Sequence, residues 1–427
     1  MKRLFRHAQI ATEDSPKLSQ ADVLVEHGRI TGVAASIEDV AGAEVIDCTG
    51  RIILPALFDL HVHAREPGGE EKEDVRSSSE AGINGGITGM VLQPNTEPAI
   101  DSAGAVQNVL DSIREKSRIW RSVFTAGAIT KGRKGEELAG IAGMKNRGVA
   151  YLTDDHSPVA NPQILRRAME YAKQFDLPIA SYCDVKELSG KGTMHEGSVS
   201  YALGLPGIPS LSEEICIARD IRIAQYAGVH LHVQHVSTRE GMETICRAKE
   251  RGIRVTCEVT PHHLLFNHHH IGNFDTQYKV YPPLRTEEDN EALLEGLKRG
   301  CFDVIVTDHS PHTEFAKNQD FASAPFGITG LETALPALYH HFIKPGKLGW
   351  DVLVKRFSAE PRRWMKQEVA VIKEGAAAEF VVFNPQRSST FTREFLRSKS
   401  INTPFFGKTL DGLVERVIHQ GEELLSR

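Results

Sequence analysis

Long hydrophobic runs are missing from this 427-residue chain. No stretch approaches the roughly 20 consecutive apolar residues that a membrane-spanning helix needs, so we expect no transmembrane segment. The N-terminus, MKRLFRHAQIATEDSPKLSQ, carries basic residues but lacks the apolar stretch of a signal peptide. We therefore expect a cytoplasmic protein.

Cysteine is scarce, and no two cysteines stand in a C-x-x-C pair. This spacing argues against a disulfide framework and against a thiolate zinc site. We expect the cysteines to be small buried hydrophobic residues. The six positions are Cys48, Cys183, Cys216, Cys246, Cys257 and Cys301.

A strong excess of charge of one sign is also absent. The net charge is -6, with 25% charged and 41% hydrophobic residues, as in an ordinary globular protein with a large core. Such a balance provides no long-range attraction toward nucleic acid or an anionic membrane, so it favours small-molecule chemistry.

Short strand-like runs separated by helical patterns begin near Leu57, which is typical of repeated βα units around a parallel sheet. We count as many such runs as a closed (β/α)8 barrel of the TIM type requires. The candidate strands are Phe58–His63, Thr88–Gln93, Ser122–Ala128, Val149–Thr153, Pro178–Cys183, His230–His235, Arg254–Val259 and Asp303–Thr307.

The two ends of the chain read differently, as short strands and turns without a long helix. We predict that residues 1–53 and 365–427 form one composite β-domain and that residues 54–364 form the barrel. Within the barrel, Asn161-Pro162 is a cap followed by a first-turn proline, and it predicts the start of an outer helix.

The strongest chemical signal is His61-Val62-His63, because residues i and i+2 of a strand face the same side. Imidazole is a common zinc ligand, and barrel enzymes hold their chemistry at the C-terminal ends of strands. An isolated H-x-H is more often structural. Here, however, further potential ligands follow the later candidate strands, namely Asp154, Asp155, His235 and Asp308.

Other histidines fit a ligand role less well. His230 and His232 share a strand with His235, but their side chains are expected to face the opposite side of that strand. We therefore interpret them as structural. The tract His268–His270 is expected to be a solvent-exposed loop. Arg65 has the parity of His63, and its planar guanidinium suits a carboxylate, although a surface salt bridge is an equal alternative.

Several motifs in this order resemble the class I dihydroorotases of the amidohydrolase superfamily. They are HVHAREPGG, GMVLQPNTEP, TDD, LHVQHVST, VTPHHLLF, PPLR, VTDHSPH and APFG, between Leu54 and Glu332, with SINTPFFG nearer the C-terminus. The related hydantoinases and allantoinases generally place a carboxylated lysine where this chain has Asp155, which favours the dihydroorotase branch.

The resemblance implies one or two zinc ions and a cyclic-amide hydrolase. His61, His63 and Asp308 would hold one zinc, and Asp155 would bridge to a second ion at His235. A hydroxide activated by zinc would open the ring amide of L-dihydroorotate, and Asp308 would pass the proton to the departing nitrogen. The reverse reaction would close N-carbamoyl-L-aspartate for pyrimidine synthesis. The residues implied to hold the substrate are Arg65, Asn95, His312 and the backbone of Phe326 and Gly327.

The chain departs from the family pattern at three positions. Tyr182 stands where the family has a metal-binding histidine, so we expect one tightly held zinc, with any second ion held weakly. His156 replaces a glycine, and we hypothesise that its ring partly compensates. Tyr281 stands where the family has an asparagine that hydrogen-bonds the substrate.

These departures leave an alternative open, in which the chain is a weak or inactive subunit that scaffolds aspartate carbamoyltransferase. Barrels of this kind often self-associate, so we expect a homo-oligomer.

Overall fold

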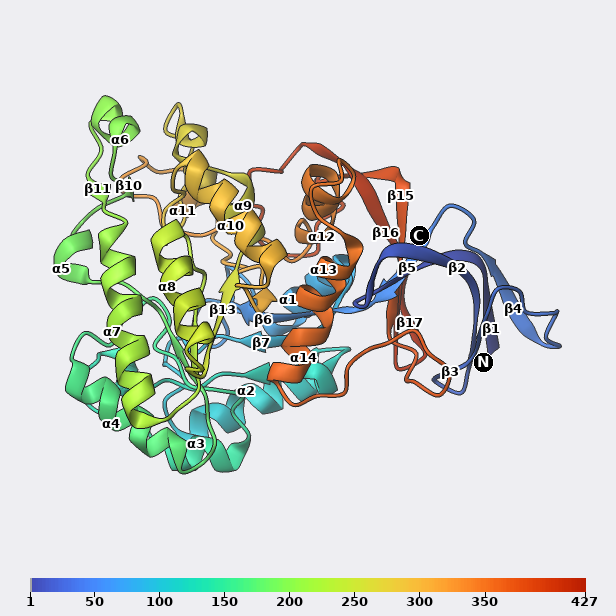
Figure 1. The fold of residues 1–427 in the computed structure, drawn as a ribbon, viewed down its shortest axis with the longest axis horizontal. Helices are drawn as coiled ribbons and strands as arrows, with labels where there is room; N and C mark the ends of the chain where they lie inside the picture. The colour runs from blue at the N-terminus through green and yellow to red at the C-terminus, as the bar shows by residue number, and fades with distance from the viewer. Residues whose placement is uncertain (1) are drawn as a thin grey trace.

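The computed structural model describes residues 2–427, and its architecture is an α/β barrel beside a strongly curved β-sheet (Figure 1). The sheet has the order β17-β16-β15-β5-β1-β2-β3, with β4 paired to β1, so both ends of the chain build it. Its strands are β1 (Lys2–Thr12), β2 (Ser15–Glu26), β3 (Arg29–Ala34), β4 (Ala43–Asp47), β5 (Ile52–Pro55), β15 (Phe380–Thr390), β16 (Thr409–His419) and β17 (Glu422–Ser426).

The composite sheet forms because β5 pairs in parallel with β1 and antiparallel with β15. Successive side chains of these strands point to opposite faces, and one face buries a separate core that includes Phe5, Val23, Ile53 and Phe380. The rings of Phe5 and Phe380 meet edge to face with centroids 5.1 Å apart. The segment after β5 leads directly into the first barrel strand, so the sheet is anchored beside the barrel (Figure 1).

The barrel consists of two runs of parallel strands, β6-β7-β8 and β9-β12-β13-β14. Single-residue bridges close the ring, between Val62 and His309 on one side and through Leu152 to Gly127 and Ile179 on the other. The expected barrel is therefore confirmed. The strands are β6 (Leu57–Val62), β7 (Ile87–Leu92), β8 (Val123–Thr125), β9 (Ile179–Ser181), β12 (Leu231–Val233), β13 (Val255–Val259) and β14 (Val304–Ile305).

The expected fourth strand at residues 149–153 is the exception. Only Leu152 forms bridges there, so the segment is not a regular strand in the described chain. The backbone nevertheless crosses the gap, because Gly127 N donates to Tyr151 O at 2.9 Å and Ala180 N donates to Leu152 O at 2.8 Å. Asp154 and Asp155 still follow the segment at the end where the other strands finish.

Helices cover the outside of the barrel (Figure 1). The expected helix is α4 (Pro162–Lys173), and Asn161 caps it as predicted, accepting from Gln163 N at 2.9 Å. The others are α1 (Val75–Asn84), α2 (Ala103–Lys116), α3 (Ile141–Arg147), α5 (Lys186–Ser189), α6 (Ser198–Leu203), α7 (Leu211–Ala227), α8 (Arg239–Glu250), α9 (Pro261–Leu265), α10 (Glu287–Arg299), α11 (Glu314–Lys317), α12 (Ala334–Leu338), α13 (Trp350–Val354) and α14 (Glu360–Trp364).

Short elements complete the chain. A two-stranded sheet of β10 (Met194–His195) and β11 (Gly207–Ile208) extends beyond the barrel with α6, as Figure 1 shows. The 3-10 and π turns lie at Trp120–Ser122, Lys131–Arg133, His268–Ile271, Thr276–Tyr278, Tyr339–Ile343 and Lys355–Ala359.

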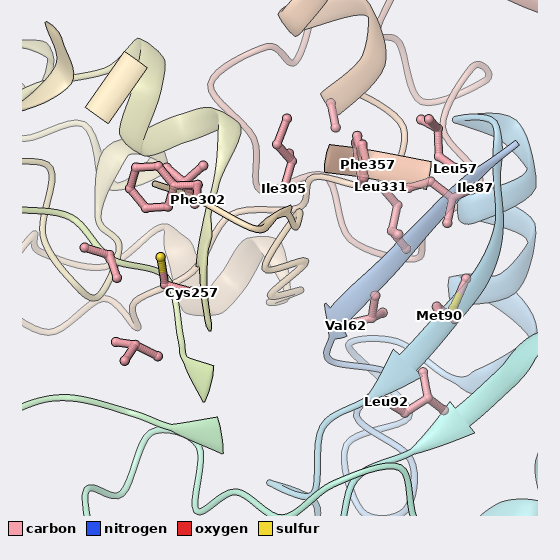
Figure 2. Close-up of a cluster of buried hydrophobic side chains, with 14 of the residues drawn as sticks. Leu57, Val62, Ile87, Met90, Leu92, Cys257, Phe302, Ile305, Leu331 and Phe357 are labelled. Carbon is pink, nitrogen blue, oxygen red and sulfur yellow. The ribbon is translucent and has the colours of Figure 1, made fainter. Parts of the chain in front are cut away.

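The main core lies between the strands and the helices around them. Figure 2 shows part of it, with Leu57 and Val62 of β6 beside Ile87, Met90 and Leu92 of β7. These side chains are almost fully buried, as expected for strands covered on both faces. In residues 2–427 no helix is both long and apolar enough to cross a membrane.

The prediction for the cysteines was wrong at two positions. Cys246 of α8 and Cys301, just after α10, form a disulfide across a Cα separation of 5.5 Å. The two helices pack side by side, which brings together thiols that lie 55 residues apart in the sequence. The other four cysteines are free and buried, as expected.

Candidate active site

The pair His61 and His63 lies at the C-terminal end of β6, and both side chains are fully buried. Their ring centroids are 5.3 Å apart, as the period-two spacing predicts for one face of a strand. His63 Nε2 lies 3.2 Å from Asp308 Oδ1, and His61 Nε2 lies 3.7 Å from the same oxygen. Asp308 follows β14, so the first and last strands of the barrel meet here.

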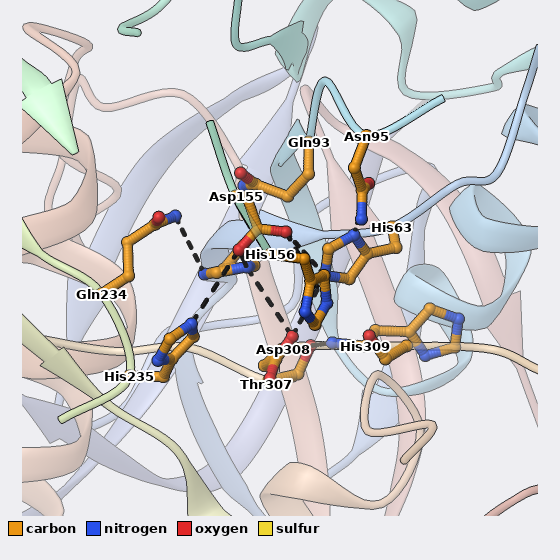
Figure 3. Close-up of polar contacts among 12 residues, drawn as sticks. His63, Gln93, Asn95, Asp155, His156, Gln234, His235, Thr307, Asp308 and His309 are labelled. Atoms are coloured by element: carbon orange, nitrogen blue, oxygen red, sulfur yellow. Dashed lines mark hydrogen bonds and ion pairs between the residues drawn. The ribbon is translucent and has the colours of Figure 1, made fainter. Parts of the chain in front are cut away.

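Asp155, which follows the irregular segment at Leu152, completes the cluster and lies beside His63, His235 and Asp308 (Figure 3). Its Oδ1 lies 3.5 Å from His61 Nε2, and its Oδ2 lies 3.6 Å from His63 Nε2. His235 Nε2 lies 3.9 Å from Asp155 Oδ1. The structure thus brings together all five residues that the sequence singled out as metal ligands.

The donor set fits a metal ion. His61 Nε2, both oxygens of Asp155 and both ring nitrogens of His235 are buried without a hydrogen-bond partner in residues 2–427. Leaving several buried polar atoms unpaired is costly, so such atoms point to a ligand. His61, His63 and Asp155 each offer one potential ligand atom within 4.8 Å of the others, which suits a single cation.

Glu258 of β13 is a residue that sequence reasoning missed. It is buried, and its Oε1 accepts from His61 Nδ1 at 2.6 Å while its Oε2 lies 3.0 Å from His232 Nε2. This carboxylate directs the other nitrogen of His61 toward the cluster. A lone acidic residue in an otherwise apolar strand was the available signal. The structural interpretation of His232 agrees with its contact to Glu258.

Charges within the cluster favour ionised carboxylates. Burial alone would raise the pKa of Asp308, but His61, His63 and His235 outweigh it and hold the pKa below its usual range. Burial likewise opposes ionisation of Asp155, and His156, His235 and His61 lower its pKa well below the usual value. Asp308 is therefore a carboxylate at neutral pH, which is the form that accepts a proton.

Backbone strain gathers at the same place. His235, Asp308, Arg65 and His156 have φ values of 31°, 47°, 59° and 61°, a region that residues with side chains seldom occupy. Such strain persists only where the surrounding structure imposes it, and it is common at functional sites.

The residues expected to hold a substrate surround the cluster. Asn95 Oδ1 lies 2.8 Å from His63 Nδ1, which orients that ring and leaves the Asn95 amide nitrogen free for other contacts. Arg65 Nε donates to Pro311 O at 3.3 Å, and His312 Nε2 donates to Phe326 O at 2.9 Å. Arg65 is therefore tied to the loop after β14 and is not a surface salt bridge.

Gly327 is required by this loop. Its φ is +144°, and an added Cβ would lie 2.8 Å from Ser310 O and 3.0 Å from the His312 ring. Asn402, which sequence reasoning did not single out, donates to Ser310 O at 3.0 Å and Gly327 O at 3.1 Å. The SINTPFFG segment therefore clamps the loop from outside the barrel.

The three departures from the family pattern lie close together. Tyr182 and Tyr281 stack with centroids 5.9 Å apart, and Tyr182 also packs 5.1 Å from His235 and 5.4 Å from His156. The Tyr281 hydroxyl donates to Asp184 Oδ2 at 2.7 Å. Burial, together with Tyr281 and Asp184, raises the pKa of Tyr182 well above its usual range, which disfavours the phenolate that a metal would need.

The tract His268–His270 differs in part from expectation. It forms a 3-10 turn in which His269 and His270 are exposed, as predicted, but His268 is only 6% exposed. His268 packs against His195 of β10 with centroids 5.3 Å apart, and this contact covers its ring.

Solved structures share the complete fold. The chain matches dihydropyrimidinase from Brevibacillus agri with a TM-score of 0.85 and 22% identity, over 100% of this chain and 95% of that one. L-hydantoinase from Arthrobacter aurescens matches with a TM-score of 0.88 and 22% identity, over 100% and 96% of the two chains. At this identity the likeness supports the barrel with its β-domain and nothing finer.

Sequence comparison finds relatives with a much higher identity than these solved structures. Residues 50–241 match the Dihydro-orotase-like family model. Dihydroorotase from Caldanaerobacter subterraneus is 43% identical over 94% of this chain and 93% of that protein. Dihydroorotase from Carboxydothermus hydrogenoformans is 40% identical over 99% and 97%. With this likeness along nearly its whole length, and with its barrel and histidine–aspartate cluster, the chain belongs to the dihydroorotase family of the amidohydrolase superfamily.

Proposed function

We propose that this protein is a zinc-dependent dihydroorotase, which reversibly hydrolyses the cyclic amide of L-dihydroorotate to N-carbamoyl-L-aspartate in pyrimidine biosynthesis. The observation that carries the proposal is the convergence of unpaired, buried atoms of His61, Asp155 and His235 beside the Asp308 carboxylate. Near-full-length similarity to dihydroorotases supports the choice of substrate.

Zinc suits the nitrogen and carboxylate donors of this cluster. We assign His61, His63 and Asp308 to one tightly held ion, with Asp155 beside it and His235 on its far side. Tyr182 packs against His235 as a neutral phenol, so any second ion at His235 and Asp155 is held weakly. His156 Nε2, 3.8 Å from Asp155 Oδ2, is a candidate substitute ligand, and unchanged zinc content in His156→Ala would reject that role.

Zinc, when bound, activates water and polarises the ring carbonyl. The chain's own contribution to proton transfer is Asp308, whose carboxylate lies at the centre of the cluster and is ionised at neutral pH. Asp308 takes the proton from the attacking water and delivers it to the ring nitrogen as the carbon–nitrogen bond breaks. In the direction of synthesis Asp308 removes the proton from the attacking nitrogen.

The carboxylate of the substrate is assigned to Arg65, Asn95 and His312, with the backbone of Phe326 and Gly327. Arg65 and His312 are both fixed to the loop that also carries Phe326. Tyr281 offers the substrate its ring and not its hydroxyl, because Asp184 binds that hydroxyl. This wall of the pocket is therefore less polar than an asparagine would make it.

We also propose the domain limits 1–53 plus 365–427 for the β-domain and 54–364 for the barrel. The mixed sheet that joins β5 to β1 and β15 supports this division. Self-association remains part of the proposal. No comparison favours the alternative of a scaffold for aspartate carbamoyltransferase.

Turnover of L-dihydroorotate by metal-free protein, before and after addition of zinc, tests the function. We expect turnover that depends on zinc and falls by roughly 10²–10⁴-fold in Asp308→Ala, the range for removal of a general acid–base group. Asp320→Ala removes an exposed carboxylate and serves as the control. Absence of turnover at every zinc concentration would reject the proposal and make the scaffold role the leading one.

A further inference from the structure

Two lysines from separate segments lie buried beside the Phe326–Gly327 loop, which borders the proposed substrate site. Lys279 and Lys317 are each only 2% exposed. Lys317 follows the His312 segment in α11, and Lys279 lies just before Tyr281. Neither residue belongs to the metal cluster, and the proposed mechanism uses neither.

Backbone carbonyls supply all the hydrogen-bond partners of these two ammonium groups in residues 2–427. Lys317 Nζ donates to Pro325 O and Gly327 O, both at 3.1 Å, and approaches Lys279 O at 3.5 Å. Lys279 Nζ donates to Phe321 O at 2.6 Å and Ala322 O at 3.0 Å.

Three carbonyl acceptors around Lys317 Nζ require three N–H donors, which only the charged form provides. Burial acts in the opposite direction and lowers the pKa of Lys317 to about 7 and that of Lys279 to about 8. No ion pair compensates either charge in the part of the chain that the structure describes. Asp275 partly offsets the effects of burial and of Lys279 on the pKa of Lys317 but forms no ion pair with that lysine. Buried charges that lack a paired counter-charge are costly, so an anion bound nearby would be stabilising.

The loop that these lysines hold is the one assigned to the substrate carboxylate. Lys317 binds Gly327 O, while Lys279 O accepts from Gly327 N at 2.9 Å and Lys279 Nζ lies 4.6 Å from the Phe326 ring centroid. Burial lowers the pKa of His312, and the positive charges of Arg65 and Lys317 lower it further. Positive charge is thus concentrated behind the loop assigned to the substrate carboxylate.

We propose that Lys279 and Lys317 are specificity-determining positioning residues, whose buried charges make the Phe326–Gly327 loop select an anionic ring substrate over neutral cyclic amides. The inference rests on the proposed function, because it takes this loop as the carboxylate subsite. It adds a source of selectivity behind the residues that contact the substrate.

Equilibrium binding of orotate and uracil tests the inference, because these planar rings differ by one carboxylate. Binding to the zinc-loaded protein is measured by calorimetry for wild type, Lys317→Met and Lys279→Met. We expect each variant to lose roughly tenfold in orotate affinity, because each substitution removes one positive charge from behind the proposed carboxylate subsite. Uracil affinity should stay within about twofold by the same reasoning, since uracil carries no charge.

Lys408→Met is the matched control, because Lys408 is an exposed lysine near the same loop. Thermal unfolding and zinc content are measured for every variant. Equal losses for orotate and uracil, or failure of both variants to fold, would assign the lysines a structural role and overturn the inference. A wild type without preference for orotate would overturn it as well.

Kinetics with L-dihydroorotate provide a second readout. The inference predicts a raised KM with kcat nearly unchanged, whereas a disturbed metal site would lower kcat and zinc content. If wild type binds orotate in a Lys317-dependent manner yet never turns over L-dihydroorotate, the proposed function fails while the charge selectivity stands.

Discussion

At the scale of single residues, a hydrogen bond to one ring nitrogen decides which nitrogen each histidine of the cluster can offer to a metal. His61 has two ring nitrogens, and Glu258 occupies Nδ1 at 2.6 Å, which leaves Nε2 for the metal. Asn95 performs the same task for His63. These partners fix the tautomer and direction of each ring before a metal arrives.

Removal of the Glu258 carboxylate should therefore weaken zinc binding. We expect Glu258→Ala to lower zinc affinity by about 10–100-fold, the usual effect of losing such a partner. Competition with a chromogenic chelator measures the change. Glu250→Ala, which removes an exposed carboxylate from the end of α8, is the control. Equal zinc affinity in the two variants would show that His61 needs no such support.

Tyr182 offers a direct test of the number of metals. Tyr182→His places an imidazole beside His235 and Asp155, so we expect the zinc content measured by mass spectrometry to rise toward two per chain. Tyr182→Phe removes only the hydroxyl and should keep the wild-type content. Two zinc ions already present in the Phe variant would contradict the proposal that Tyr182 disfavours the second site.

At the scale of secondary-structure elements, the strands position the site and the helices around them supply the stability. Ligands come from the ends of β6, β12 and β14 and from the irregular segment after Leu152. The irregular segment does not disturb the site, because Asp154 is anchored there by Ile129 N at 2.8 Å and Thr130 N at 3.0 Å. Local capping can be tested separately from the site.

Asn161 caps α4 through hydrogen bonds from Gln163 N and Ile164 N. We expect Asn161→Ala to lower the free energy of unfolding by about 1 kcal/mol without affecting activity. Chemical denaturation followed by circular dichroism measures this loss. Gln163→Ala, an exposed change in the same helix, should have no such cost, and an equal loss in both variants would reject the capping role.

At the scale of the whole molecule, the metal cluster joins segments from both halves of the barrel. Zinc binds only the folded arrangement, so its removal by a chelator should lower the melting temperature. A free zinc concentration of about 100 times Kd corresponds to about 2.7 kcal/mol of stability. Scanning calorimetry of the protein with and without zinc measures the difference, and identical melting curves would contradict a built metal site.

This stabilisation should also depend on pH. Imidazoles must be neutral to bind zinc, so protons compete with the metal for the histidine ligands. Burial opposes protonation of His61, but Glu258, Asp155 and Asp308 raise its pKa well above the usual imidazole value, so this competition begins at a higher pH than for a free histidine. The difference in melting temperature between zinc-loaded and metal-free protein should therefore shrink as the pH falls from 8 toward 5. A constant difference over this range would exclude histidine ligands.

The sequence by itself determined the features that depend on local spacing. The period of two along a strand places His61 and His63 on one face. The Asn161-Pro162 pair is a local signal for the start of a helix. Asp155, His235 and Asp308 were predictable because they follow strand-like runs, and parallel strands end on one side of a barrel. The family motifs added the substrate-binding set, which remains a proposal.

Only the tertiary structure decided which distant groups meet. Glu258 forms a hydrogen bond with His61 across 197 sequence positions, and Cys246 forms a disulfide with Cys301 across 55. No local sequence pattern predicts the backbone carbonyls that surround the ammonium groups of Lys279 and Lys317. The same is true of the hydrogen bond from Tyr281 to Asp184. Such contacts depend on strand order, helix packing and loop closure, which place side chains without regard to their separation along the chain.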